Sequence, residues 1–104
     1  MSWKVCSEPF LNAHLIFPTQ QRDVKKVIDT LSAFPEVRSI VVFGSSVTCL
    51  CNPWSDLDVF VDCPIGFQRP PIRTEAALDF WTPETVDDNL MREVLQKGVV
   101  VYEQ

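Results

Sequence analysis

Residues 41–62 of the chain read VVFGSSVTCLCNPWSDLDVFVD: an apolar segment, a polar connection, and a second apolar segment that contains two aspartates. Asp56 and Asp58 stand at alternate positions, and alternate side chains of a strand share one face, with about 7 Å between their Cα atoms. Such carboxylates repel each other, and each is costly to bury without a partner. A divalent cation removes both costs, so the pattern predicts a Mg²⁺ site.

The dipeptide Gly44–Ser45 directly follows the first apolar segment. Glycine permits a close approach of the backbone, and amides that open the next turn point at an anion, as at helix N-termini. The Ser45 hydroxyl adds a donor. Gly-Ser alone is usually an ordinary loop element, but Asp56 follows Gly44 by twelve residues, which lets the connection fold back. The two motifs together predict a phosphate-binding turn beside a metal site.

A third acid, Asp79, lies inside the apolar segment ALDFW, residues 77–81. One interpretation is a residue at the edge of a sheet, or one that is salt-bridged to Arg38 or Arg73. The other is a third carboxylate that completes a two-metal site. The residues alone leave both interpretations open.

The hydrophobic pattern predicts helices and short strands in alternation, without internal repeats. The Pro-rich segment at residues 63–73 is expected to be a loop. In chain order we expect a helix at 19–34, a strand at 38–43, a helical turn from Ser45, strands at 57–61 and 75–81, a helix at 82–97, and a strand at 99–102.

Both expected helices have an apolar face and a polar face. In the first, the apolar residues are Val24, Val27, Ile28 and Leu31, and the residues expected toward solvent are Arg22, Asp23, Lys25 and Lys26. In the second, they are Val86, Leu90, Met91, Val94 and Leu95. The sequence Thr82-Pro83-Glu84 is typical of a helix start, and Lys97-Gly98 of a helix that ends in a left-handed residue.

The chain has 104 residues and a formal net charge of −5. This length suits one domain, residues 19–104, which we expect after an irregular N-terminal arm, residues 1–18. The acidic balance argues against non-specific nucleic-acid binding, which needs clustered Lys and Arg. The sequence contains no apolar run long enough to cross a membrane and no signal pattern at its start, so we expect a cytoplasmic protein.

The four cysteines do not have the spacing of a zinc site built from two close pairs. We expect reduced, structural cysteines, since no secretory signal favours disulfides. Zinc binding, with His14 as an additional ligand, is the less favoured interpretation. The cysteines are Cys6, Cys49, Cys51 and Cys63.

The motifs around Gly44–Ser45, Asp56, Asp58 and Asp79 resemble those of the minimal nucleotidyltransferase domains of the DNA polymerase beta superfamily. The family pattern is an apolar strand, Gly-Ser, about a dozen residues, an Asp-x-Asp element in the next strand, and a third acid in a later strand. Here the pattern is FGS at residues 43–45, SDLD at residues 55–58, and Asp79 in the strand that begins the closing strand–helix–strand unit. The resemblance covers residues 20–103.

The resemblance implies an α+β nucleotidyltransferase fold, with a short mixed β-sheet flanked by helices. It implies that Asp56 and Asp58 bind two Mg²⁺ ions, with Mn²⁺ as an alternative, and that Asp79 helps to hold the second ion and activates the acceptor hydroxyl. Gly44, Ser45 and Ser55 would bind the nucleotide. The implied reaction transfers a nucleoside monophosphate from a nucleoside triphosphate to an acceptor hydroxyl and releases pyrophosphate.

The sequence departs from the family where relatives commonly carry Arg or another polar residue after Gly-Ser, and often a second basic residue and a glycine further on. Here Ser46, Val47, Thr48 and Cys49 hold those places. The resemblance suggests a helical partner protein, as in toxin–antitoxin systems. The alternative to an active transferase is a weakly active or inactive antitoxin or binding subunit. An unrelated small α/β domain is the remaining hypothesis. Trp54, Phe67 and Trp81 are candidates for a partner surface, although ordinary packing is favoured for each.

Overall fold

The computed structural model describes residues 3–5, 9–48 and 55–104. Its helices are α1 (Gln21–Leu31) and α2 (Asp88–Lys97), and its strands are β1 (Ser39–Phe43), β2 (Leu57–Asp62), β3 (Leu78–Trp81) and β4 (Val99–Glu103). Three short 3-10 helices are η1 (Ala13–Leu15), η2 (Pro18–Gln20) and η3 (Gly44–Val47). The predicted order of helices and strands is confirmed.

The four strands form one mixed sheet in the order β3-β2-β1-β4. β1 runs antiparallel to both of its neighbours, whereas β2 and β3 are parallel. Phe43 at the end of β1 pairs with Asp58 near the start of β2, and Asp58 pairs in turn with Asp79. The predicted motifs therefore meet at one end of the sheet. This α+β arrangement confirms the predicted fold class.

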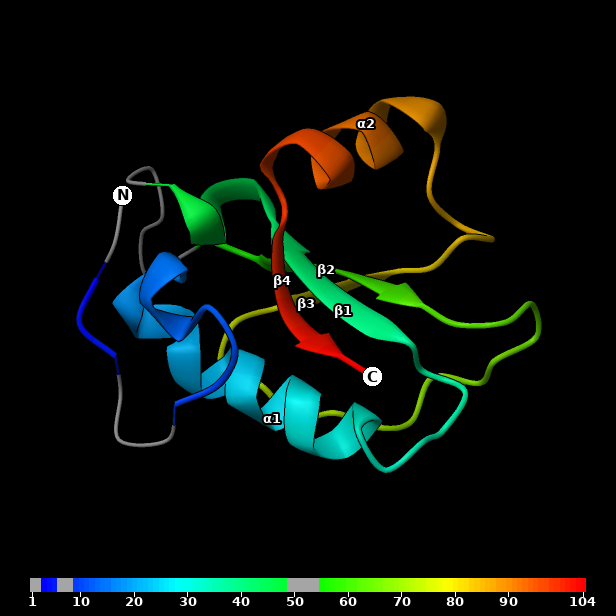
Figure 1. The fold of residues 1–104 in the computed structure, drawn as a ribbon, viewed down its shortest axis with the longest axis horizontal. Helices are drawn as coiled ribbons and strands as arrows, with labels where there is room; N and C mark the ends of the chain where they lie inside the picture. The colour runs from blue at the N-terminus through cyan, green and yellow to red at the C-terminus, as the bar shows by residue number, and fades with distance from the viewer. Residues whose placement is uncertain (1–2, 6–8, 49–54) are drawn as a thin grey trace.

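The helices cover opposite faces of the sheet, with α1 below it and α2 above it in Figure 1. On the α1 face, apolar side chains of α1 pack against those of alternate strand residues, including Ile40, Val42, Leu57, Val59 and Val61. On the α2 face, Val94 packs with Val41, Phe43 and Phe60. Because strand side chains alternate between faces, Asp58 lies on the α2 face with Phe60.

The prediction that Asp23 faces solvent is wrong. Its side chain is only 3% exposed. Its two carboxylate oxygens accept hydrogen bonds from the backbone amides of Glu75 and Ala76, each at 2.9 Å. These amides are therefore not available to pair with β2, which explains why β3 begins at Leu78 rather than at Glu75 as predicted.

The predicted start of α2 is also wrong. Residues 82–85 form a separate turn, in which the amides of Thr85 and Val86 donate to the Thr82 carbonyl. The helix begins at Asp88, because the Asp87 side chain caps it by accepting from the Leu90 amide at 2.7 Å. A carboxylate at the N-cap satisfies an amide that has no partner within the helix.

The predicted left-handed end of α2 is not found, since Gly98 has φ −68° and ψ 150°. Glycine is required there for space, because a Cβ atom would lie 2.3 Å from the Val94 carbonyl oxygen and 2.4 Å from Val41 Cγ1. The apolar stripe of α2 is narrower than predicted. Leu95 is 74% exposed, whereas Val94 is buried.

Segments outside the helices and strands also contribute to the core. Ile16 is fully buried, and Ala13 is 2% exposed. In the Pro-rich loop, Phe67 packs edge-to-face on Phe34. Cys63 is a buried free cysteine, while Cys6, Cys49 and Cys51 lie outside the described residues. In the part of the chain that the structure describes, none of the helices is both long and apolar enough to span a membrane.

The capping bond of α2 can be tested with Asp87→Ala, which we expect to lower the free energy of unfolding by about 1 kcal/mol. Asp88→Ala is the matched control, because it removes the same charge from the same turn without removing the bond to the Leu90 amide. Urea denaturation measures both variants. An equal loss in the two would show that charge near the helix end, rather than the cap, stabilises α2.

Candidate functional site

Two acidic side chains meet where β2 and β3 begin. Asp58 and Asp79 are direct cross-strand partners in the parallel pair. Their side chains share a face of the sheet and lie within hydrogen-bonding reach, so the protonated carboxyl of Asp58 donates to Asp79. Both are half-buried. The structure thus brings together two of the three predicted acids.

The surroundings of Asp58 oppose its ionisation. They raise the pKa of Asp58 from 3.8 to about 7, mainly through burial, then through the hydrogen bond and the negative charge of Asp79, and further through the charges of Asp56 and Glu93. At neutral pH this carboxyl is therefore poised between its two forms. A cation placed between the acids would favour the ionised form of both.

Gly44 lies against this acidic pair. Its φ of +74° belongs to the left-handed region, which suits glycine, and a Cβ atom there would lie 2.5 Å from Asp58 Oδ2. Both the backbone conformation and the contact therefore require the absence of a side chain. This arrangement places the backbone of the Gly44–Ser45 turn directly beside a carboxylate.

Asp56 precedes β2 and is exposed, yet it is close enough to raise the pKa of Asp58. Among the described residues, however, no three Asp, Glu, His or Cys side chains are grouped tightly enough to hold a metal ion. The Asp58–Asp79 pair offers hard oxygen ligands, which fit Mg²⁺, an ion that commonly binds one or two carboxylates and retains several waters. The pair therefore fits one such ion, and among the described residues Asp56 is not grouped with it closely enough to complete a three-acid site.

The described residues give no support to the interpretation of Asp79 as half of a salt bridge. In residues 3–5, 9–48 and 55–104, the ion pair is Lys25–Asp29, so neither Arg38 nor Arg73 pairs with Asp79. Asp79 instead lies beside another acid, Asp58. A carboxyl whose pKa is raised by a neighbouring acid is typical of functional sites.

The turn after Gly44 is held from inside the protein. Ser45 is half-buried, whereas Ser46 is fully buried, and its hydroxyl donates to Gln20 Oε1. The carbonyl of Ser46 accepts from the Phe17 amide at 2.8 Å. Ser46 therefore faces the core, and the polar groups left at the surface of this turn are the backbone and Ser45. The nucleotide-binding role of Gly44 and Ser45 stays a prediction.

Ser55 is half-buried at the other end of the connection, immediately before Asp56. Its carbonyl accepts from Gln20 Nε2 at 3.0 Å. The same amide side chain thus contacts both Ser46 and Ser55, so it joins the two ends of a connection whose middle lies outside the described residues.

Glu93 and Gln20 are not among the residues predicted from the sequence. Glu93 lies on α2, and its charge contributes to the raised pKa of Asp58. It stands next to Val94, the buried residue of α2, so its position at the border of the apolar face was the available signal. Gln20 precedes the first regular turn of α1, and no local pattern indicates that its amide bridges two distant segments.

Of the three aromatic candidates for a partner surface, two lie in described segments. Trp81 packs against the apolar cluster beneath α2, and its indole Nε1 is buried with no hydrogen-bond partner. Phe67 packs on the opposite cluster. Both therefore contribute to packing, as the sequence favoured, while Trp54 lies outside the described residues.

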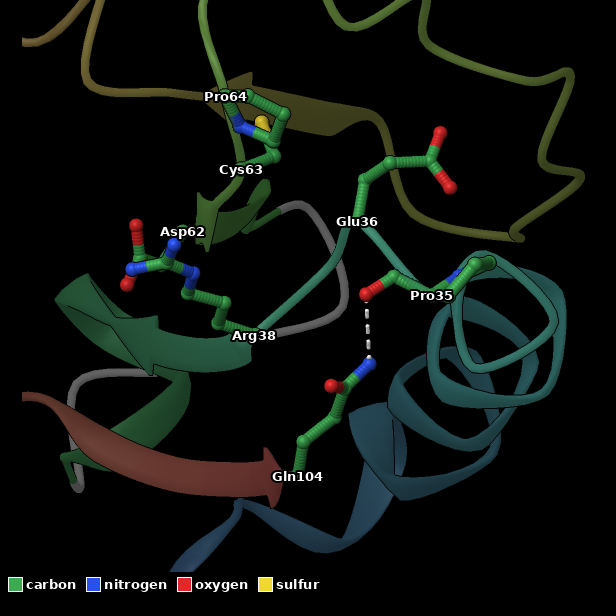
Figure 2. Close-up of a pocket in the computed structure, with 7 residues that line it drawn as sticks. All are labelled: Pro35, Glu36, Arg38, Asp62, Cys63, Pro64 and Gln104. Carbon is green, nitrogen blue, oxygen red and sulfur yellow. Dashed lines mark hydrogen bonds between the residues drawn. The ribbon is translucent and has the colours of Figure 1, made fainter.

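A hollow of about 350 Å³ lies at the other end of the β1–β2 pair, where Ser39 is opposite Asp62 (Figure 2). It is lined by residues of the loop after α1, the ends of the strands and the C-terminus, and the Gln104 amide donates to the Pro35 carbonyl at 3.0 Å. Asp62 and Asp58 are separated by about 13 Å along the strand. This hollow is therefore distinct from the acidic pair.

Comparison with known proteins points to one family. The sequence pattern described as "Nucleotidyltransferase domain" matches residues 24–101. Among solved structures, a chain in the crystal structure of a mutant of the toxin–antitoxin MntA–HpeT has a TM-score of 0.62 at 15% sequence identity. The alignment covers 77% of this chain and 73% of that chain, which establishes similarity of fold. A search of the curated proteins found no match.

The raised pKa of Asp58 predicts that stability depends on pH in the metal-free protein. Between about pH 4 and 7 the folded chain holds this proton more tightly than the unfolded chain does. The resulting stabilisation is fully present below about pH 4 and is lost as the pH rises through 7. We expect a loss of ~1–2 kcal/mol, reduced by solvent screening because Asp58 is half-buried.

Unfolding free energies measured with a chelator present, from pH 4 to 8.5, test this dependence. Asp58→Asn should remove that part of the decline, whereas the exposed control Asp29→Asn should retain it. A decline of the same size in Asp58→Asn would assign the effect to other groups.

The contact between Gly44 and Asp58 can be tested with Gly44→Ala, using Gly66→Ala as a matched control. Gly66 also has a left-handed backbone, with φ +88°, but nothing lies within 4 Å of its Cβ position. We expect each variant to lose about 1–2 kcal/mol through backbone strain. Only Gly44→Ala should also shift the titration of the Asp58 carboxyl, followed by ¹³C NMR. Unchanged titration in Gly44→Ala would contradict the close contact.

Proposed function

Because the chain belongs to the nucleotidyltransferase domain family, we propose that it transfers a nucleoside monophosphate from a nucleoside triphosphate to an acceptor hydroxyl. The observation that carries the proposal is the pair Asp58–Asp79, held side by side next to the Gly44–Ser45 turn. In the proposed reaction the acceptor oxygen forms a bond to the α-phosphorus. The bond between that phosphorus and the pyrophosphate oxygen breaks, and pyrophosphate leaves.

Asp58 and Asp79 are the proposed Mg²⁺ or Mn²⁺ ligands, and Asp56 is the proposed third ligand. Bound cations of this kind neutralise phosphate charge and act as Lewis acids on the phosphoryl oxygens. The raised pKa of Asp58 supports this assignment, because the excess negative charge that resists its ionisation is what a cation would offset. The proposal extends to two ions, as the family resemblance implies.

The chain's own groups position the reactants. We propose that the backbone of Gly44 and the hydroxyl of Ser45 bind the terminal phosphates, with Ser55 at the nucleotide side of the connection. Asp79 accepts the proton of the acceptor hydroxyl. Reactions of this class depend mainly on alignment and on oriented charges, so a rigid turn next to two carboxylates is a suitable arrangement.

We propose a helical partner protein as the source of the acceptor hydroxyl. The support is the shared fold with a chain of a structure titled as a toxin–antitoxin. A cytoplasmic location, with access to nucleoside triphosphates and Mg²⁺, is part of the same proposal.

A second candidate is a nucleotidyltransferase-fold subunit that binds its partner without efficient catalysis. The inward orientation of Ser46 favours it, because its hydroxyl is used in the bond to Gln20 and not at the surface of the turn. Residues 44–55 also contain neither Lys nor Arg, so this connection supplies no positive charge to a triphosphate. In this case the acidic pair would serve for binding alone.

The experiment is incubation with Mg²⁺ and each nucleoside triphosphate labelled at the α-phosphate, with and without candidate helical partner proteins. We expect label transfer and pyrophosphate release that fall about 100-fold or more in Asp58→Asn, since one group that stabilises the transition state is lost. Asp29→Asn, which changes an exposed acid of α1, should remain active.

The other outcomes separate the candidates. Binding of Mn²⁺ and nucleotide without turnover, under all acceptor conditions, would favour the binding subunit. Failure to bind either would contradict both functions.

A further inference from the structure

Two buried polar side chains at the start of α1 contact the segments that carry the predicted motif. Gln20 and Asp23 are each 3% exposed. Gln20 bonds to Ser46 and Ser55, and Asp23 bonds to the amides of residues 75 and 76. Neither side chain contributes to the apolar face of α1. Their bonds therefore serve segments that lie far away in the sequence.

The contacts of Asp23 lead directly to Asp79. Residues 75 and 76 are held by the Asp23 carboxylate, and the carbonyl of the next residue, Ala77, accepts from the Leu57 amide at 2.8 Å. From this bond onward β3 follows β2 in parallel, which brings Asp79 opposite Asp58. Asp23 thus holds the backbone at the point from which the pairing of the two acids begins.

The contacts of Gln20 act on the other half of the site. Ser46 comes directly after the Gly44–Ser45 turn, and Ser55 comes directly before Asp56. Since one amide bonds to both, it links the turn directly to the residue before Asp56. Figure 1 shows α1 on the face of the sheet opposite α2, so these bonds reach the site from behind.

We propose that the N-terminal end of α1 is a positioning element for the site, with Asp23 fixing the register of Asp79 and Gln20 fixing the turn relative to Asp56. The proposal rests on the proposed nucleotidyl transfer for its kinetic consequences. Stability alone does not explain why a carboxylate occupies position 23. Burying a carboxylate is costly, and an apolar side chain would stabilise this position as well. Two charge-assisted bonds to adjacent amides hold a backbone in one orientation, which apolar packing does not.

Asp23→Asn is the main test, because it keeps the shape of the side chain but leaves one oxygen to accept from two amides. We expect the variant to fold, to lose the backbone NOEs between Asp58 and Asp79, and to bind Mn²⁺ at least tenfold more weakly by EPR. kcat should fall at least tenfold while KM for the nucleotide stays within about twofold. Asp29→Asn, an exposed acid on the same helix, should change none of these.

Gln20→Ala should give the opposite kinetic pattern. We expect KM for the nucleotide to rise at least fivefold, with the NOEs between Asp58 and Asp79 retained. A general loss of packing would not separate the two effects, so this split distinguishes positioning from stability alone. If Asp23→Asn fails to fold, Ala76→Pro removes one of the two donor amides from the opposite side and should reproduce its loss of NOEs.

The proposal is overturned if folded Asp23→Asn keeps the NOEs between Asp58 and Asp79, or if Ala76→Pro keeps them. It is also overturned if Asp23→Asn and Gln20→Ala change kcat and KM in the same proportion. If the unmodified protein neither binds Mn²⁺ nor transfers a nucleotide, the proposed function fails. The NOE measurements on metal-free protein then still decide whether Asp23 sets the register.

Discussion

The parallel pairing of β2 with β3 is the constraint on which the site depends. Asp58 and Asp79 meet only because the two strands start together, and a slip of one residue would move Asp79 to the α1 face of the sheet. Antiparallel β1 then brings Gly44 to the same end, where its missing side chain leaves room for Asp58 Oδ2. The position of Asp79 relative to Asp58 thus follows from the β2–β3 register, and that of Gly44 from the pairing of β1 with β2.

This arrangement opposes stability locally and is maintained by the rest of the fold. Two acids in contact, with Asp56 and Glu93 nearby, make ionisation of Asp58 unfavourable. The cost is offset by the apolar packing of α1 on the other face of the sheet. Perturbed carboxyls of this kind are concentrated at functional sites, where stability is lost in exchange for chemistry.

The elements with a regular period could be predicted from the sequence, because strand alternation and helix periodicity are local patterns. The same holds for the motif, since Gly44, Asp56 and Asp58 lie in one continuous run. What could not be predicted depends on partners far away in the chain. Asp23 follows the polar pattern of a solvent-facing residue, but amides 52 and 53 positions later determine its burial. A glycine after Lys97 is typical of a left-handed helix end, yet here glycine is required because a side chain would collide with Val41.

The two helices are anchored to very different extents. α1 buries six of its residues, whereas α2 buries only Val94 and ends in an extended glycine. Local unfolding costs least free energy where few apolar contacts must be broken, so α2 detaches from the sheet more readily than α1 does. Such a fluctuation would carry Glu93, whose charge raises the pKa of Asp58, away from that carboxyl. We therefore expect the charge state of Asp58 to depend on how closely α2 docks against the sheet.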